Sequence, residues 1–193
     1  MTVLVAYASK HGATRAIAER IAATLTGAGR PAEARPVERA GDLAGYDAFV
    51  IGSAAYYGHW RKAATKFVRT HTALLAKRPV WLFSSGPLGT EATDEQGNDL
   101  REAAVPKEIS ELRQAVGARE HRVFFGALAP NVLSWPQRLL RRLPAGRALL
   151  PEGDFRDWAD IDAWARAIAH ELSSPQPADP GPTDQGPTGH APP

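Results

Sequence analysis

The chain has 193 residues, a formal net charge of +2 and no cysteine. This length suits one domain with a sizeable core, and so mild a charge gives no reason to expect a nucleic-acid partner. The absence of cysteine excludes disulfides, thiol catalysis, iron–sulfur clusters and cysteine zinc sites, and we expect no bound metal. No apolar run reaches the length of a membrane span, and the N-terminus lacks a secretory signal pattern, so the sequence predicts a cytoplasmic protein.

The chain opens with an apolar strand, a polar loop and a helix. Residues 3–7 lack polar alternation, which is typical of a strand buried on both faces, and apolar residues then recur at helical spacing over 13–25. The first amides of a helix have no internal partners, and the helix dipole favours negative charge there. We therefore predict a phosphate site at Ser9, Lys10, His11, Gly12, Ala13 and Thr14. The alternative is a loop that only caps the helix. The sequences GxxxxGK[ST] and GxGxxG are absent, which argues against nucleotide triphosphatases and dinucleotide folds.

Strands and helices alternate along the rest of the chain. The patterns predict strands over 31–37, 48–52, 79–83 and 122–128, helices over 61–77 and 158–172 and from Pro106 onward, and a long loop over 90–104. The last segment, 173–193, holds seven of the sixteen prolines and is expected to be a disordered tail, which leaves 1–172 as the folded domain.

This alternation predicts an α/β fold, a doubly wound, five-stranded parallel sheet with helices on both faces and the strand order 2-1-3-4-5. In such a sheet ligands bind at the carboxyl ends of the strands, where the strand order reverses. Three glycine-bearing polar loops, Ser9–Thr14, Ser53–Trp60 and Ser84–Gly89, then lie on one rim. Their common location is a stronger signal than any single loop.

The three loops together suit flavin mononucleotide (FMN), which has a phosphate at one end and a flat ring at the other. The second loop is aromatic and suits one side of the ring, while amides of the third could bond its polar edge. The cofactor-binding candidates in these two loops are Ser53, Ala54, Ala55, Tyr56, Tyr57, Gly58, Ser84, Ser85, Gly86 and Gly89. An alternative for the tyrosines is that one of them packs in the core. His59 is a candidate catalytic proton donor because histidine titrates near neutrality, and its alternative is a capping or surface role.

The pattern SKHGAT after the first strand resembles the phosphate loop of flavodoxin-like proteins, usually [ST]-x-[ST]-G-x-T, with His11 in place of one hydroxyl residue. The segments IGSAAYYGHWRKAATKFV, FFGAL and FRDWADIDAWA are similar to the menaquinone-dependent protoporphyrinogen IX dehydrogenase branch of that family. This resemblance covers about residues 2–172. It implies an FMN enzyme of haem biosynthesis, at the cytoplasmic face of the membrane, that oxidises a porphyrinogen and passes electrons to a quinone.

One feature after the third loop keeps other functions open. The branch tends to be basic after the third loop, but here Glu91, Asp94, Glu95, Asp99 and Glu102 accompany only Arg101. A flavodoxin-type electron carrier or a quinone reductase with another donor is therefore one alternative, and a flavin-free binding module is another.

Residues 131–147 alternate Trp and Leu with Arg, which predicts a basic amphipathic helix that docks on the membrane or the quinone. Its alternative is a helix packed on the domain with its arginines in solvent.

Overall fold

The computed structural model describes residues 1–89, 93, 96, 97, 99–128 and 152–174. Its centre is a sheet of five parallel strands, β1 (Val3–Ala8), β2 (Ala32–Pro36), β3 (Ala48–Tyr56), β5 (Val80–Ser85) and β6 (Glu120–Phe124). They lie in the order β2-β1-β3-β5-β6. Counted along the chain, this is the predicted order 2-1-3-4-5, so the fold class is confirmed.

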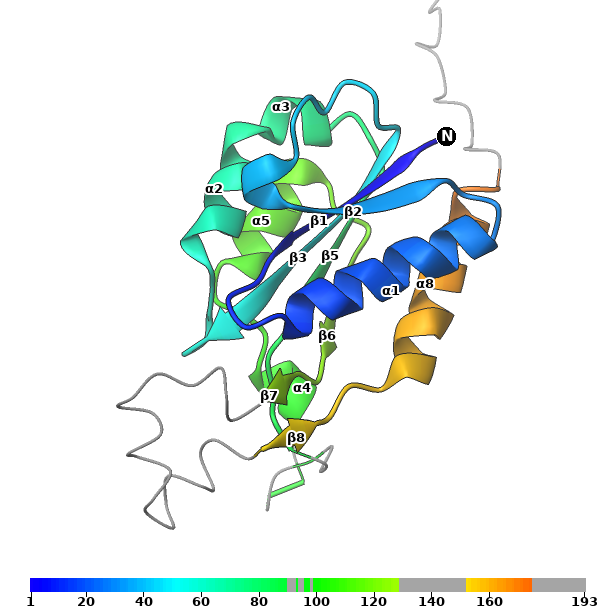
Figure 1. Ribbon diagram of the computed structural model, residues 1–193. Coiled ribbons are helices and arrows are strands. Elements are labelled where there is room, and N and C mark those ends of the chain that lie inside the picture. The colour runs from blue at the N-terminus through cyan, green and yellow to red at the C-terminus, as the bar shows by residue number, and fades with distance from the viewer. Residues whose placement is uncertain (90–92, 94–95, 98, 129–151, 175–193) are drawn as a thin grey trace, which may run out of the picture.

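Helices cover both faces of the sheet, as Figure 1 shows. The helices α1 (Ala13–Gly27) and α8 (Trp158–Glu171) pack on one face. The other face carries α2 (Lys62–Thr70), α3 (Thr72–Leu75), α5 (Ile109–Val116) and the short 3-10 helix η1 (Val37–Arg39). Alternate residues of β1 serve the two cores, with Val3 and Val5 in one and Leu4 and Ala6 in the other. This double burial explains why the strand lacks polar alternation.

The structure adds short antiparallel pieces to the predicted sheet. β3 continues past the expected end to Tyr56 and pairs with β4 (His59–Trp60) as a tight hairpin. The strand predicted over 122–128 instead begins at Glu120 and ends at Phe124, and β7 (Ala127–Leu128) pairs separately with β8 (Gly153–Asp154). Within the predicted loop 90–104, the described residues include the short helix α4 (Leu100–Ala103).

The helix predicted over 61–77 is divided at His71 into α2 and α3. Beyond the break, the Thr72 hydroxyl donates to the carbonyl oxygens of Val68 at 3.0 Å and Arg69 at 3.1 Å. A threonine side chain that bonds carbonyls one turn back competes with the helical ladder and favours such a break. Apolar periodicity alone could not reveal it, because both short helices bury the same face.

Some predictions fall on residues that the structure does not describe. The predicted docking helix at 131–147 lies outside the described residues, as does nearly all of the tail at 173–193. Among the residues that are described, no helix has the length and apolar character needed to span a membrane.

Candidate functional site

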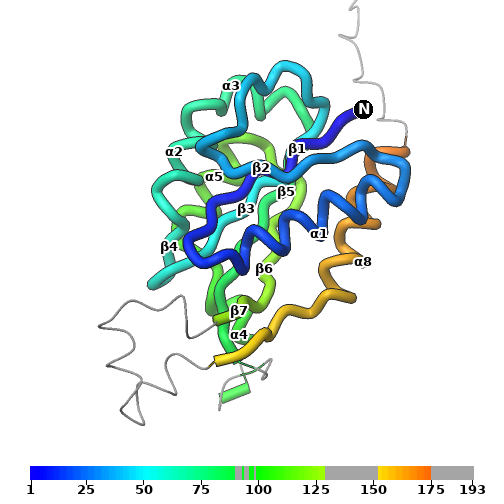
Figure 2. Tube along the Cα trace, viewed as in Figure 1, coloured from blue at the N-terminus to red at the C-terminus, as the bar shows by residue number. Residues whose placement is uncertain are grey.

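A cavity of about 520 Å³ opens at the carboxyl ends of β1, β3 and β5. In Figure 2 the loop after β1, the turn from β3 into β4 and the end of β5 all lie at this end of the sheet. The volume falls within the range of about 300–1,000 Å³ typical of ligand pockets. The cavity is lined by Ser9, Lys10, His11, Ala13, Thr14, Ala54, Ala55, Tyr56, Tyr57, Arg61, Ser85, Gly86, Leu88, Gly126, Ala127 and Leu128.

The loop after β1 presents unsatisfied hydrogen-bonding groups to this cavity. Gly12 has a φ of 89°, a left-handed conformation that glycine adopts without strain, and its amide donates to Ser9 Oγ at 3.1 Å. The Thr14 hydroxyl is fully buried and has no hydrogen-bond partner among the described residues. The first amides of α1 likewise need partners from outside the helix. A phosphate would satisfy both kinds of group at once.

The hairpin from β3 to β4 carries two tyrosines at the cavity. Its two central residues, Tyr57 and Gly58, have φ values of 52° and 73°, the conformation of a two-residue hairpin turn. Tyr56 is 39% exposed and Tyr57 is 98% exposed, so neither packs in the core. The ring of His11 meets that of Tyr56 edge-on, with centroids 6.5 Å apart. Burial raises the pKa of Tyr56, and the nearby Arg61 charge opposes that rise.

Two predicted site serines instead hold the frame of the cavity. Ser53 Oγ accepts a hydrogen bond from the Arg61 amide at 3.1 Å and is fully buried. Ser84 Oγ accepts from Trp60 Nε1 at 2.7 Å and lies 2.8 Å from His121 Nε2. Since Trp60 is the donor in the first bond, the Ser84 hydroxyl hydrogen is available to His121. Burial, with a smaller effect of the Arg113 charge, lowers the pKa of His121 to about 4, so this histidine is neutral at pH 7.

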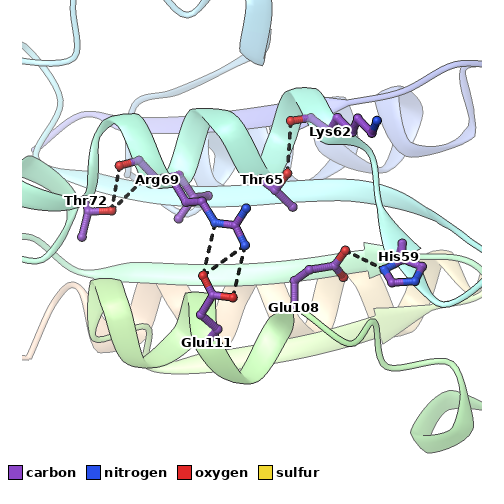
Figure 3. A network of polar contacts seen from close by, with 8 residues as sticks. His59, Lys62, Thr65, Arg69, Thr72, Glu108 and Glu111 are labelled. Atoms are coloured by element: carbon purple, nitrogen blue, oxygen red, sulfur yellow. Dashed lines mark hydrogen bonds and ion pairs between the residues drawn. The ribbon is translucent and has the colours of Figure 1, made fainter.

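His59 does not line the cavity. It lies on β4 with half of its side chain exposed, and its Nδ1 is 2.8 Å from the Glu108 carboxylate (Figure 3). Burial acts to raise the pKa of Glu108, but hydrogen bonds from His59 and from backbone amides outweigh it and lower that pKa. In the same view Arg69 of α2 bonds Glu111 of α5. These two pairs tie the hairpin and α2 to α5, and the catalytic role of His59 stays a prediction.

The other predicted residues divide clearly. Eleven of the sixteen predicted cofactor-binding residues line the cavity. A twelfth, Gly12, lies between two lining residues in the chain. Gly58 turns the hairpin, and Gly89 has a φ of 129° at the end of the third loop, but neither lines the cavity. Within the described residues, no group of three or more histidines and carboxylates could hold a metal ion.

Sequence reasoning missed five lining residues. Leu88 lies within the third predicted loop, and Arg61 follows the second, where it was expected to begin a helix. Gly126, Ala127 and Leu128 were included in the last strand, but the chain leaves that strand after Phe124 and crosses the rim. There the amide of Gly126 donates to the carbonyl of Pro87 at 2.9 Å. The glycine in FFGAL was the available signal for this bend.

Comparisons with known proteins agree with this architecture. Residues 4–145 match the family model described as a flavodoxin domain. The chain is 27% identical over 187 residues to protoporphyrinogen IX dehydrogenase [quinone] of Escherichia coli strain K12. This match covers 91% of the present chain and 98% of the relative.

Solved structures share the fold. A flavodoxin from the domain Archaea has a TM-score of 0.56 at 15% identity, and covers 90% of this chain and 100% of its own. Oxidised flavodoxin 2 from Bacillus cereus has a TM-score of 0.55 at 20% identity, over 89% and 99% of the two chains. The family match extends over most of the sequence and includes the loops after β1, β3 and β5. The chain therefore belongs to the flavodoxin domain family.

Proposed function

We propose that this protein is an FMN-dependent oxidoreductase that passes electrons from an organic donor to a quinone. The observation that carries the proposal is the cavity at the strand ends, where the unpartnered Thr14 hydroxyl and the start of α1 lie beside the Tyr56–Tyr57 hairpin. An anion site next to aromatic rings fits a phosphorylated flavin. The similarity to a quinone-linked dehydrogenase over nearly the whole chain supports the redox assignment.

The residues present fit FMN in a definite arrangement. Ser9, Thr14 and the first amides of α1 would hold the phosphate. Tyr56 and Tyr57 would contact the ring, with about 0.5–1.5 kcal/mol for an aromatic contact. Ser85 and Gly86 would bond the polar edge of the ring, while Leu88 and Leu128 would exclude water from that end of the cavity. FMN, when bound, supplies hydride and electron transfer, and the protein supplies position and electrostatics.

We further propose that the donor is a porphyrinogen and the acceptor a membrane quinone, which would make this a cytoplasmic enzyme of haem biosynthesis. The similarity to protoporphyrinogen IX dehydrogenase [quinone] supports that assignment. Contact with the inner face of the membrane through residues 131–147 is part of the same proposal, and it rests on the basic amphipathic pattern of that segment. In such an enzyme His59, on the hairpin that carries the two tyrosines, remains a candidate proton donor.

One observation favours a second candidate, an electron carrier or quinone reductase with another donor. Arg101 is the one cation between Pro87 and Val105 in the sequence. Its guanidinium lies 3.9 Å from the Asp160 carboxylate and over the Phe125 ring. Asp99 and Glu102 accompany it among the described residues. This stretch therefore carries more acidic than basic side chains, which disfavours a donor with carboxylates.

The first experiment is the visible absorption spectrum of the purified full-length protein after incubation with FMN and exhaustive dialysis. A retained, perturbed flavin spectrum is expected. Anaerobic mixing with protoporphyrinogen IX, followed by menaquinone, then separates the two redox candidates. Bleaching by the porphyrinogen and recovery with the quinone supports the dehydrogenase, whereas bleaching only by other reductants supports the carrier. A colourless protein would contradict both and leave a flavin-free binding module.

A further inference from the structure

The charged side chains that line the cavity are of one sign, positive. Lys10 and Arg61 both line it, and no Asp or Glu is among its described lining residues. Elsewhere arginines have carboxylate partners, as in the pairs of Arg20 with Asp162 and Arg69 with Glu111. Lys10 and Arg61 form no ion pair with any residue that the structure describes. The cavity therefore presents two uncompensated positive charges to a ligand.

Arg61 also holds an unsatisfied polar atom in this wall. Its Nε is buried and has no hydrogen-bond partner among the described residues. The backbone of Arg61 is fixed, because its amide donates to the buried Ser53 hydroxyl at 3.1 Å. A buried guanidinium N–H without a partner is costly, since it has given up water and received no acceptor in return. An anion bound by the Arg61 guanidinium would supply such an acceptor.

Lys10 lies in the loop after β1, and Arg61 precedes α2 directly after the β3–β4 hairpin. His11, in that loop, lines the same cavity, and its pKa is lowered first by burial and then by the charges of Lys10 and Arg61. A lowered pKa favours the neutral form of His11 at pH 7, so Lys10 and Arg61 are the main positive charges on this side of the cavity. His11 stands where related phosphate loops have a hydroxyl, and Thr14 with its unpartnered hydroxyl follows three residues later.

We propose that Arg61, with Lys10, is the anion-binding pair that recognises the phosphate of FMN, and that it replaces the hydroxyl lost at His11. This inference rests on the proposed function. A phosphate monoester carries about −1.5 to −2 charges at pH 7, which matches two cations. A carboxylate of the substrate is the other source of such an anion. Each carboxylate carries one charge, so a phosphate monoester matches two cations better than any one carboxylate does.

The test compares FMN with riboflavin, which has the same ring and no phosphate. Dissociation constants for both flavins are measured by fluorescence quenching with the full-length protein and its Arg61→Gln variant. Loss of one charge-assisted hydrogen bond is expected to weaken FMN binding about 10- to 100-fold and to leave riboflavin binding unchanged within about threefold. Raising the salt concentration should weaken FMN binding to the wild type more than riboflavin binding.

Two variants serve as controls. Lys66→Gln removes the same charge from the exposed face of α2, outside the cavity, and should leave the FMN-to-riboflavin ratio unchanged. Arg61→Lys restores the charge and should recover part of the FMN affinity. Equal weakening of both flavins by Arg61→Gln would overturn the proposal, because it would place Arg61 at the ring or in the frame of the cavity. Unchanged FMN affinity with a raised KM for an anionic donor would also overturn it, in favour of a substrate carboxylate.

Failure of the proposed function would be visible separately. If the wild type binds neither flavin, inorganic phosphate is titrated instead, with the ring resonances of His11 followed by NMR. A saturable shift that is lost in Arg61→Gln would uphold the anion-binding pair in a protein without flavin. Absence of any shift in the wild type would overturn the pair together with the flavin assignment.

Discussion

The Thr14 hydroxyl is costly to the fold unless a ligand forms a hydrogen bond with it. It is fully buried in the first turn of α1, and its Oγ1 has no partner among the described residues. A buried, unsatisfied hydroxyl costs about 1–3 kcal/mol. Under the proposed function, the phosphate of FMN would supply the missing partner.

Replacing Thr14 with valine should therefore separate stability from binding. Thr14→Val keeps the shape and removes the unsatisfied group, so the free energy of unfolding of the protein without cofactor should rise by about 1 kcal/mol. FMN affinity should fall about tenfold. Urea unfolding and flavin fluorescence check the two effects. Thr65→Val on α2 is the matched control, because its hydroxyl already donates to the Lys62 carbonyl at 3.1 Å and its loss should bring no gain. A less stable Thr14→Val variant would contradict the argument.

Gly52 is required by close packing between two strands. It pairs with Phe83 across β3 and β5, and a Cβ added at Gly52 would lie 2.0 Å from the Phe83 ring. That ring is itself confined by Phe124 and Trp164, at centroid distances of 6.1 and 6.3 Å. Gly52→Ala should therefore lower the free energy of unfolding by at least about 2 kcal/mol. Gly45→Ala, where a Cβ meets nothing within 4 Å, should change it by less than about 0.5 kcal/mol in urea unfolding.

A second substitution that removes the obstructing ring would confirm that this clash is the cause of the lost stability. Adding Phe83→Leu to Gly52→Ala shortens the obstructing side chain and should recover part of the loss. If the double variant is no more stable than Gly52→Ala alone, contact with the ring is not the reason for the glycine.

At the scale of elements, the β3–β4 hairpin holds Tyr57 in a conformation that tyrosine disfavours. Its φ of 52° suits asparagine or glycine in a two-residue turn. Tyr57→Asn should raise the free energy of unfolding by up to about 1 kcal/mol, measured by thermal unfolding without cofactor. The same change removes an aromatic contact and should weaken FMN and riboflavin equally, about 2- to 10-fold. Tyr57→Ala is the control, since alanine loses the ring without relieving the strain, and a stabilised alanine variant would contradict this reading.

The carboxylate of Asp162 on α8 joins this helix to α1. Asp162 accepts from Arg20 at 2.7 and 2.6 Å and from the Thr24 hydroxyl at 2.9 Å. The hydrogen bond from Arg20 is the main cause that lowers the pKa of Asp162 from 3.8 to about 2. Because the folded pKa is the lower one, this stabilisation is present above about pH 4 and is lost as the pH falls towards 2. The difference in unfolding free energy between the wild type and Asp162→Asn should shrink in that window; a constant difference would exclude titration of Asp162.

At the scale of the whole molecule, His121 should make the free energy of unfolding sensitive to acid at a higher pH than Asp162 does. Its ordinary pKa of 6.5 falls to about 4 on burial, so the unfolded chain takes up a proton before the native protein does. Stability should therefore fall between about pH 6.5 and pH 4, by at most about 1.4 kcal/mol per pH unit, and His121 should add nothing further below that range. His121→Gln, which keeps an acceptor for Ser84, should flatten this part of the urea-unfolding profile. An unchanged slope would contradict the assignment.

Much of the fold was accessible from the sequence because it depends on local patterns. Uninterrupted apolar strands, amphipathic helices and the glycine-bearing loops between them predicted the sheet, its order and the common rim of three loops. The candidate site was predicted in part for the same reason, since Tyr56, Tyr57 and Ser85 follow strand ends that the sheet brings together. The break at His71 was not predictable, because it depends on a hydrogen bond that leaves the apolar pattern unchanged, and the exit of the chain after Phe124 was marked in the sequence only by Gly126.

The sequence by itself determined the class of fold, the edge of the sheet where the cavity opens and the family to which the loops point. Only the tertiary structure decided which polar side chains face that cavity. Ser53 and Ser84 resemble binding residues in the sequence but hold the frame, while Arg61, expected only to begin a helix, faces the cavity. The physical reason is that strand and helix periods are local, whereas the partner of a hydroxyl or a guanidinium is set by neighbours far apart in the chain.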